Sequence, residues 1–323
     1  MPIKSISVDD IFIEKSRFSL DAFLFEPGTD EACPAESFKH LGILQPVVVY
    51  RESSGQFHLI DGKKRIRYAR QSRSKEINAI VLAEKSPVTD IITLILCERN
   101  GKIKSGIMNK VRFICFALSL HAPESWILEK LCMPLGFKPY SAFLRDCEAI
   151  SKLPEGLQQI CHEKKFSFKQ ILNLTHYPHD ILTLLITWKP VLQLTASILD
   201  EMASNLKDYL KARNTGIENF LAEPGISEII NSGLSPRDKT ERLRRLIYLK
   251  QYPVLSEVNA GIHKTIRRLN LPEDISIEWD RTLENKCLDF TIHMQGTEKW
   301  QRVLDTLNSE KLKKAIESIL DKL

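Results

Sequence analysis

The residues best suited to chemistry lie in one short run between an apolar β-type segment and a helical pattern, Asp61-Gly62-Lys63-Lys64-Arg65-Ile66-Arg67. A glycine at a strand-to-helix turn lets the backbone approach an anion, and the first turn of the helix presents unpaired N–H groups. Cations are unfavourable beside the positive end of the helix dipole. Four basic side chains in this turn therefore predict that an anion shares the site, either a nucleotide phosphate or a nucleic acid.

The charge of the whole chain supports a localised site rather than a generally basic protein. The 323 residues carry a formal net charge of only +5, yet residues 63–112 hold 13 basic side chains against 4 acidic ones. A block of this kind is typical of a polyanion site, although a solvated helix face would look the same. Residues 234–269 hold a second excess, nine basic against three acidic, with the same two interpretations: a second nucleic-acid contact or a solvated pair of helices.

Other features exclude several classes of protein. No run of about 18 apolar residues is present, and the N-terminus lacks an apolar signal core, so we expect a cytoplasmic protein without a membrane span. The seven cysteines are scattered singly, which is typical of reduced structural thiols and not of a metal site. The histidines show no triad-like arrangement and are interpreted as surface or packing residues.

Residue patterns predict a small α/β unit followed by helices and a compact tail. The apolar run 3–12 predicts an opening strand, 46–50 and 56–60 a hairpin, and 77–82 another strand. Helical patterns interrupted by prolines follow from residue 89. In the tail, 276–279 and 287–294 predict two strands, followed by one terminal helix from residue 297.

Two segments are specific enough to compare with a known family. Gly42-Ile43-Leu44-Gln45-Pro46 is similar to a G-L-x-Q-P motif, with isoleucine at the second position. Gly62-Lys63-Lys64-Arg65-Ile66-Arg67 is similar to G-E-R-R-x-R, with lysines at the second and third positions. In this order they resemble the N-terminal domain of the ParB family of chromosome and plasmid partition proteins. Two further segments extend the resemblance to roughly residues 3–190: Glu98-Arg99-Asn100-Gly101-Lys102 stands where the family has E-N-x-x-R, and Ile150–Leu157 resembles the join after its helix-turn-helix.

The resemblance implies a nucleotide site. Members of the family bind CTP with a metal ion, close as a clamp on DNA and hydrolyse the nucleotide slowly. By position, the residues around CTP would be Gln45, Gly62, Lys63, Lys64 and Arg65. Glu98 would help to hold Mg²⁺, but Arg99 replaces the neighbouring asparagine and cannot be an oxygen ligand. We therefore expect phosphate binding with little hydrolysis, at most that of a weak CTPase.

The resemblance also implies a site for double-stranded DNA. A helix-turn-helix would lie within 124–151, with Gly136 in the turn and 140–150 as the recognition helix. The side chains available to DNA are Lys138, Tyr140, Ser141 and Arg145, together with Arg67 in the basic stretch of residues 63–112. A plain helical bundle is the alternative. A ParA-type ATPase and a second copy of the chain are the protein partners that the family implies.

The predicted fold class is α+β, with three domains. They are a small ParB/sulfiredoxin-like α/β domain (1–88), an all-helical domain with the helix-turn-helix (89–212) and a small α+β domain that would dimerise (234–323). Sulfiredoxin chemistry is excluded because it needs a reactive cysteine in the glycine turn, where this chain has lysines. The alternatives left open are a metal-dependent nuclease, for which only Asp61 and Glu98 lie near the motif, and a DNA-binding regulator that works without nucleotide.

Overall fold

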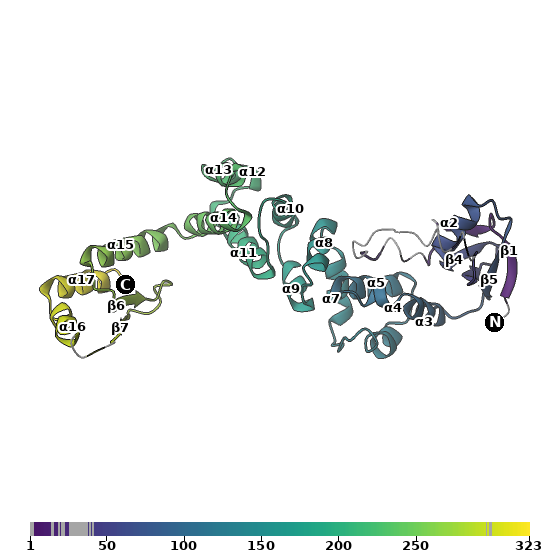
Figure 1. Ribbon diagram of the computed structural model, residues 1–323, viewed down its shortest axis with the longest axis horizontal. Helices are drawn as coiled ribbons and strands as arrows, with labels where there is room; N and C mark the ends of the chain where they lie inside the picture. The colour runs from purple at the N-terminus through teal and green to yellow at the C-terminus, as the bar shows by residue number, and fades with distance from the viewer. Residues whose placement is uncertain are drawn as a thin grey trace. The chain divides into compact units, whose positions relative to one another are not determined.

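A computed structural model describes residues 3–13, 16–18, 20, 23–25, 38, 40, 42–294, 296 and 299–323. These form two compact units, one of residues 1–189 and 194–200, the other of residues 190–193 and 201–323. Each unit is described by itself. The fold class is α+β, as predicted: an N-terminal sheet, a helical middle and a C-terminal hairpin with helices (Figure 1). The three-domain division stays a prediction.

The first unit begins with a five-stranded mixed sheet in the order β1-β5-β3-β4-β2. Its strands are β1 (Ile3–Ser7), β2 (Ile11–Phe12), β3 (Val47–Arg51), β4 (Phe57–Asp61) and β5 (Glu76–Leu82). β3 pairs antiparallel with β4 through the predicted hairpin and parallel with β5. The prediction of one opening strand over 3–12 was wrong. A turn at Ser7–Asp10 splits this run, so that β1 pairs with β5 at one edge and β2 with β4 at the other.

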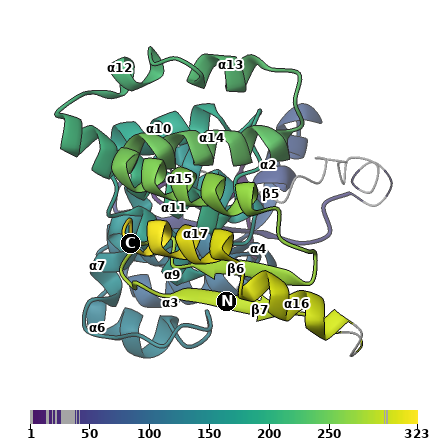
Figure 2. The same ribbon diagram turned by 90° about the vertical axis from the view of Figure 1, so that its left-hand side faces the viewer.

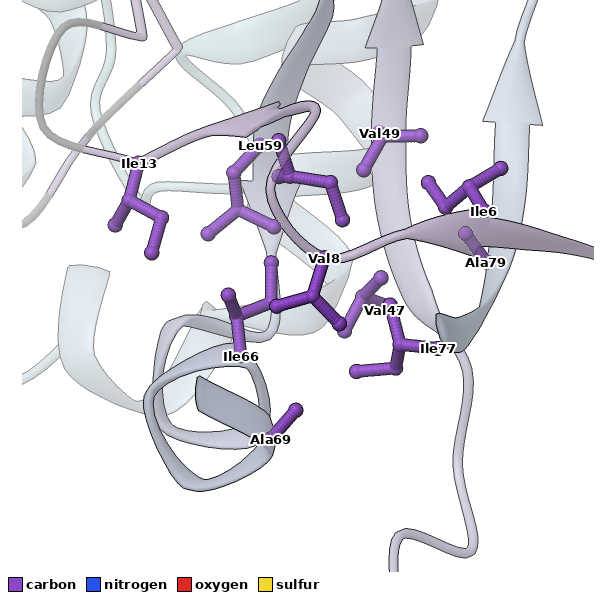
Figure 3. Packing of buried hydrophobic residues seen from close by; sticks show 11 residues of the cluster. Ile6, Val8, Ile13, Val47, Val49, Leu59, Ile66, Ala69, Ile77 and Ala79 are labelled. Atoms are coloured by element: carbon purple, nitrogen blue, oxygen red, sulfur yellow. The ribbon is translucent and has the colours of Figure 1, made fainter. Parts of the chain in front are cut away.

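Helix α2 (Lys63–Gln71) covers one face of this sheet through Ile66 and Ala69, which are both fully buried. They pack against alternate side chains of the strands, among them Val47, Val49 and Leu59 (Figure 3). Alternation places every second residue of a strand on the same face, so one side of β3 meets the helix. The arrangement fixes the start of α2 directly beside the buried end of β3.

The helical middle follows the sheet in the same unit. Its helices are α3 (Val88–Glu98), α4 (Asn100–Ile103), α5 (Ile107–Ser119), α6 (Glu124–Trp126), α7 (Phe143–Ser151), α8 (Glu155–Glu163), α9 (Phe168–Leu174) and α10 (His179–Thr187). A π-helical turn, η1 (Ile127–Leu131), continues α6. Prolines stand directly before α3, α6, α8 and α10, where their fixed φ and missing N–H suit a helix start.

The second unit holds the remaining helices and a two-stranded hairpin. Its elements are α11 (Ala196–Arg213), which starts in the first unit, α12 (Ile217–Leu221), α13 (Ile226–Asn231), α14 (Pro236–Gln251), α15 (Pro253–Leu269), β6 (Ile275–Trp279), β7 (Leu288–Ile292), α16 (Trp300–Leu307) and α17 (Glu310–Leu320). Both views show α17 beside α15 (Figure 2). The prediction of one terminal helix was wrong, because Ser309 caps a separate helix by accepting the N–H of Leu312.

None of the helices in the described part of the chain combines the length and the hydropathy needed to cross a bilayer.

Candidate functional site

The turn between β4 and α2 is built around Gly62. Its backbone is left-handed (φ 109°, ψ 24°), a conformation that costs residues with a Cβ atom about 1–2 kcal/mol. A Cβ atom at this position would also lie 2.6 Å from Cγ1 of the fully buried Val47. Both observations require glycine, as the motif predicts. No described side chain caps α2, and its first turn holds no acidic residue, so the helix start suits an anion.

Arg65 connects this turn to the strand before it. Its guanidinium contacts the Asp61 carboxylate at the end of β4 and donates to the backbone oxygens of Gln45 and Pro46. The pair is largely shielded from solvent, with 17% of the Arg65 side chain and 21% of the Asp61 side chain exposed. Arg65 therefore holds the G-I-L-Q-P segment against the glycine turn.

Asp61 also meets a second guanidinium, from the end of α3. Nη2 of Arg99 lies 3.7 Å from Oδ1 of Asp61, and only 13% of the Arg99 side chain is exposed. Two guanidinium groups thus share one carboxylate, which leaves Asp61 poorly suited to a metal ion. From the sequence, Arg99 is interpreted only as a lost metal ligand, and its contact with Asp61 is not predicted. Asp61 and Arg65 are four residues apart, but Asp61 lies in β4 before the helix, so the i, i+4 rule for helices does not predict their contact.

The structure gathers most of the predicted nucleotide residues at the turn. Lys63 and Lys64 belong to the first turn of α2, with Lys63 half-buried and Lys64 exposed, and Gln45 is exposed beside Arg65. Glu98 is different: it is exposed at the end of α3. Among the described residues, no ion pair joins Glu98 to the cations of the turn, and no three His, Cys, Asp or Glu side chains cluster as a metal site would require.

Comparison with known families identifies the domain that carries this turn. The family described as ParB N-terminal domain matches residues 34–95, which include the G-I-L-Q-P segment, Gly62 and all of α2. The chain carries a ParB N-terminal domain. Within this domain the glycine turn and the Arg65 contacts to residues 45 and 46 bring together the two motifs that suggested the family.

Two solved structures of one ParB protein are similar to the chain. Both are of the C-terminally truncated chromosome-partitioning protein ParB from Caulobacter crescentus. The one complexed to the centromeric parS site has 11% sequence identity and a TM-score of 0.32, and the match covers 62% of this chain and 98% of that one. The one complexed with CTP-γ-S has 11% identity and a TM-score of 0.25, with 58% and 99% covered. No curated protein matches the sequence.

The helical segment after the ParB N-terminal domain contains the predicted DNA-reading element. Gly136 has a left-handed φ of 78° and ends the segment of α6 and η1, as expected for the turn. Helix α7 then packs inward through Phe143, Cys147 and Ile150, spaced i, i+4 and i+7. The Phe143 ring lies 5.1 Å from that of Phe137 and 5.5 Å from that of Phe168. The opposite side of α7 is accessible to solvent or to a ligand.

The predicted DNA-binding side chains lie around the start of α7. Lys138, Tyr140, Ser141 and Arg145 are all exposed. The predicted start of the recognition helix at residue 140 was wrong: α7 begins at Phe143, and Tyr140 and Ser141 lie in the turn before it, after Pro139. The backbone N–H of Phe143 donates to the backbone carbonyl oxygen of Tyr140 at 3.0 Å, which closes this turn. Arg67 is exposed on α2, within the ParB N-terminal domain.

Tyr140 is held in place by α7 itself. Its hydroxyl donates to the Asp146 carboxylate, although 46% of the tyrosine is exposed. Partial burial, together with this hydrogen bond, raises the pKa of Tyr140 to about 12. The hydroxyl therefore stays protonated near neutral pH, and Asp146, an acidic residue on the predicted recognition helix, is occupied by the tyrosine.

The buried cysteines of this segment are unsuited to nucleophilic chemistry. Burial raises the pKa of Cys132 to about 11 and that of Cys161 to about 12. Both thiols are therefore protonated at neutral pH, whereas a reactive cysteine needs its thiolate.

Proposed function

We propose that this protein binds double-stranded DNA through the turn before α7 and the first turns of that helix, in chromosome or plasmid partition or a related regulatory role. The observation that carries the proposal is the exposed group Lys138, Tyr140, Ser141 and Arg145 around one helix start. Polar side chains near the N-terminus of such a helix read base edges, and the cations contact phosphates. The aromatic packing of Phe143 fixes the helix that presents them.

The ParB N-terminal domain supports the partition role. The similar Caulobacter protein was crystallised with a parS site, and we extend DNA binding from that protein to this chain as part of the proposal. Location at the nucleoid in the cytoplasm, a ParA-type ATPase partner and a homodimer belong to the same role.

Fluorescence anisotropy with a labelled duplex, at several salt concentrations, tests DNA binding. Each phosphate-contacting cation contributes about one unit to the slope of log affinity against log salt. The double variant Lys138→Gln/Arg145→Gln is therefore expected to bind weakly and to flatten the slope by about two units. The control removes the same charge at two exposed lysines elsewhere, Lys164→Gln/Lys211→Gln, and is expected to keep the wild-type slope.

A wild-type affinity that does not change between low and moderate salt would contradict DNA binding. Equal losses in the two double variants would instead contradict the assignment to the start of α7.

A second proposed function is nucleotide binding at the Gly62 turn, with CTP as the expected ligand. The residues fit a phosphate: the turn admits only glycine, the helix start is uncapped by any described side chain, and Lys63 and Lys64 stand in its first turn. The fit to Mg²⁺ is weaker, because Asp61 faces two guanidinium groups. Glu98 would be the carboxylate for an ion that arrives with the phosphates, and Gln45 would face the same ligand.

Equilibrium binding of labelled CTP, ATP and GTP, with and without Mg²⁺ and with and without DNA, tests the nucleotide site. We expect CTP to bind in the absence of Mg²⁺ and to be hydrolysed little. Lys64→Gln should weaken binding, whereas Lys75→Gln, which removes an exposed lysine outside the turn, should not. A strict Mg²⁺ requirement would contradict this account of the site.

Failure of all three nucleotides to bind would favour a regulator that acts on DNA without nucleotide. The nuclease alternative gains no support, since the described residues bring no group of carboxylates together.

A further inference from the structure

The second unit contains a groove of about 900 Å³ formed by α14, α15 and the end of β6. Among the residues that the structure describes, five cationic side chains and no acidic one line it: Arg245, Lys264, Arg267, Arg268 and Arg281. The aromatic rings of Tyr248 and Trp279 and the imidazole of His263 share the lining. All of these residues belong to one unit, so the groove depends on nothing outside it.

Helix periodicity gathers the cations. Lys264, Arg267 and Arg268 lie on one face of α15, because residues three and four apart are neighbours on a helix. Arg245 comes from the facing side of α14, and all four are exposed. In the part of the chain that the structure describes, no carboxylate lies within ion-pair distance of them. By contrast, the neighbouring Arg244 is paired with Glu201 and Glu241.

Like charges that gather in a concave surface without counter-charges concentrate anions there. This arrangement distinguishes the groove from a solvated helix face, where both signs of charge normally alternate. The basic side chains of residues 234–269 therefore fall into two groups. Some, such as Arg244, are paired with carboxylates, and others line the groove.

The position of Trp279 is fixed by hydrogen bonds. Its indole N–H donates to Oδ1 of Asn259 at 2.6 Å, and Nδ2 of Asn259 donates to the backbone oxygens of Leu255 and Arg281 at 2.9 Å. The guanidinium of Arg281 lies 5.2 Å from the centre of a Trp279 ring. At the α14 side, Tyr248 is 37% exposed and lies 5.0 Å from the Tyr252 ring.

We propose that this groove binds single-stranded nucleic acid, with phosphates against the arginines and lysine and unpaired bases against Tyr248 and Trp279. Positive grooves with aromatic side chains bind single strands because every base has a face that can stack. The bases of a duplex already stack on one another, so aromatic rings inside a groove would gain little from it. The site is separate from the turn before α7 and does not rest on DNA binding there.

The test uses the full chain and fluorescein-labelled 15-nucleotide oligo-dT and oligo-U, with a 15-base-pair duplex as a third arm. The K138Q/R145Q variant, which lacks the proposed duplex site, is expected to bind the single strands more tightly than the duplex. The slope of log affinity against log salt changes by about 0.7 for each phosphate contact of a single strand. Arg267→Gln/Arg268→Gln should therefore flatten the slope by about 1.4 units.

The matched control is Arg237→Gln/Arg242→Gln, which removes two exposed arginines of α14 outside the groove and should keep the slope. Stacking gives a second readout. Oligonucleotide binding should quench tryptophan fluorescence in the wild type but not in Trp279→Phe, and Tyr248→Leu should lower the affinity about fivefold or more.

Equal salt slopes for the groove variant and its control would overturn the proposal, as would quenching that persists in Trp279→Phe. Loss of duplex binding with unchanged single-strand binding in Arg267→Gln/Arg268→Gln would show that the groove takes a duplex instead. If the double variant folds poorly by circular dichroism, the single variants decide, each with about half the change in slope. Preference between oligo-dT and oligo-U identifies the natural class of strand.

Discussion

Replacing Gly62 by alanine tests the geometry of the phosphate turn directly. The left-handed backbone alone costs about 1–2 kcal/mol for a residue with a Cβ atom. The 2.6 Å approach of that atom to Val47 adds an overpacking cost of about 1–3 kcal/mol, because Val47 is fully buried and cannot move away freely. The ParB N-terminal domain of Gly62→Ala is therefore expected to lose about 2–5 kcal/mol of stability.

Gly55→Ala separates the two costs. Gly55 has a similar φ of 85°, but no described atom lies within 4 Å of its Cβ position. This control should lose only the backbone cost of about 1–2 kcal/mol. Hydrogen exchange of the amides of Ile66 and Ala69, buried on α2, reports the opening of the domain in the full chain.

The difference of about 1–3 kcal/mol between the two alanine variants corresponds to about 5- to 150-fold faster exchange in Gly62→Ala. Adding Val47→Ala removes the clashing methyl groups, so the double variant should be more stable than the sum of the two single losses predicts. Equal exchange rates in Gly62→Ala and Gly55→Ala would refute the inference that Val47 leaves no space for a Cβ atom at position 62.

Three further predictions concern other parts of the chain. Asn109→Ala removes a buried amide that forms hydrogen bonds with both the backbone N–H and the backbone oxygen of Phe25. Leaving these two groups without a partner should cost about 1–3 kcal/mol of stability and speed proteolysis near Phe25. Unchanged cleavage would contradict this prediction. Burial lowers the pKa of His162, so the unfolded chain binds a proton more readily than the folded chain does. The stability of the wild type should therefore fall as the pH drops below about 6.5, and that of His162→Phe should fall less. Melting temperatures at pH 7.5 and pH 5.5 measure this difference. Identical pH effects in both proteins would exclude this role. Ser235→Ala removes the N-cap of α14 and should destabilise the second unit by about 1 kcal/mol in urea unfolding. A shift no larger than for Ser227→Ala, which changes an exposed serine inside α13, would contradict this prediction.

The residue pattern within one short segment was sufficient to predict the two strands of the β3–β4 hairpin. Apolar β-branched residues and the turn at Gly55 indicated the β3–β4 hairpin, and both strands form as expected. The edge positions of β1 and β2 could not be predicted, because strand pairing between residues far apart in sequence leaves no local signal. The break between α16 and α17 was missed although Ser309 is a good N-cap residue, since the helical pattern runs across it.

The candidate site was predictable in its residue types but not in its contacts. Gly62 could be predicted because only glycine suits a turn that approaches an anion. Arg65 was assigned to the ligand, yet the structure directs its guanidinium to Asp61 and to backbone oxygens. Side chains of opposite charge meet when the fold brings α3 to the end of β4, and the pairing of Arg99 with Asp61 exists only in that arrangement.

Site-specific photo-crosslinking shows directly whether DNA contacts the turn before α7. A benzophenone amino acid at position 141, before α7, is compared with one at the exposed position 164 on full-length protein with a labelled duplex. We expect position 141 to crosslink to the DNA, and we expect added salt and unlabelled duplex both to reduce the yield. A yield at position 141 no higher than that at position 164 would contradict DNA binding through the start of α7.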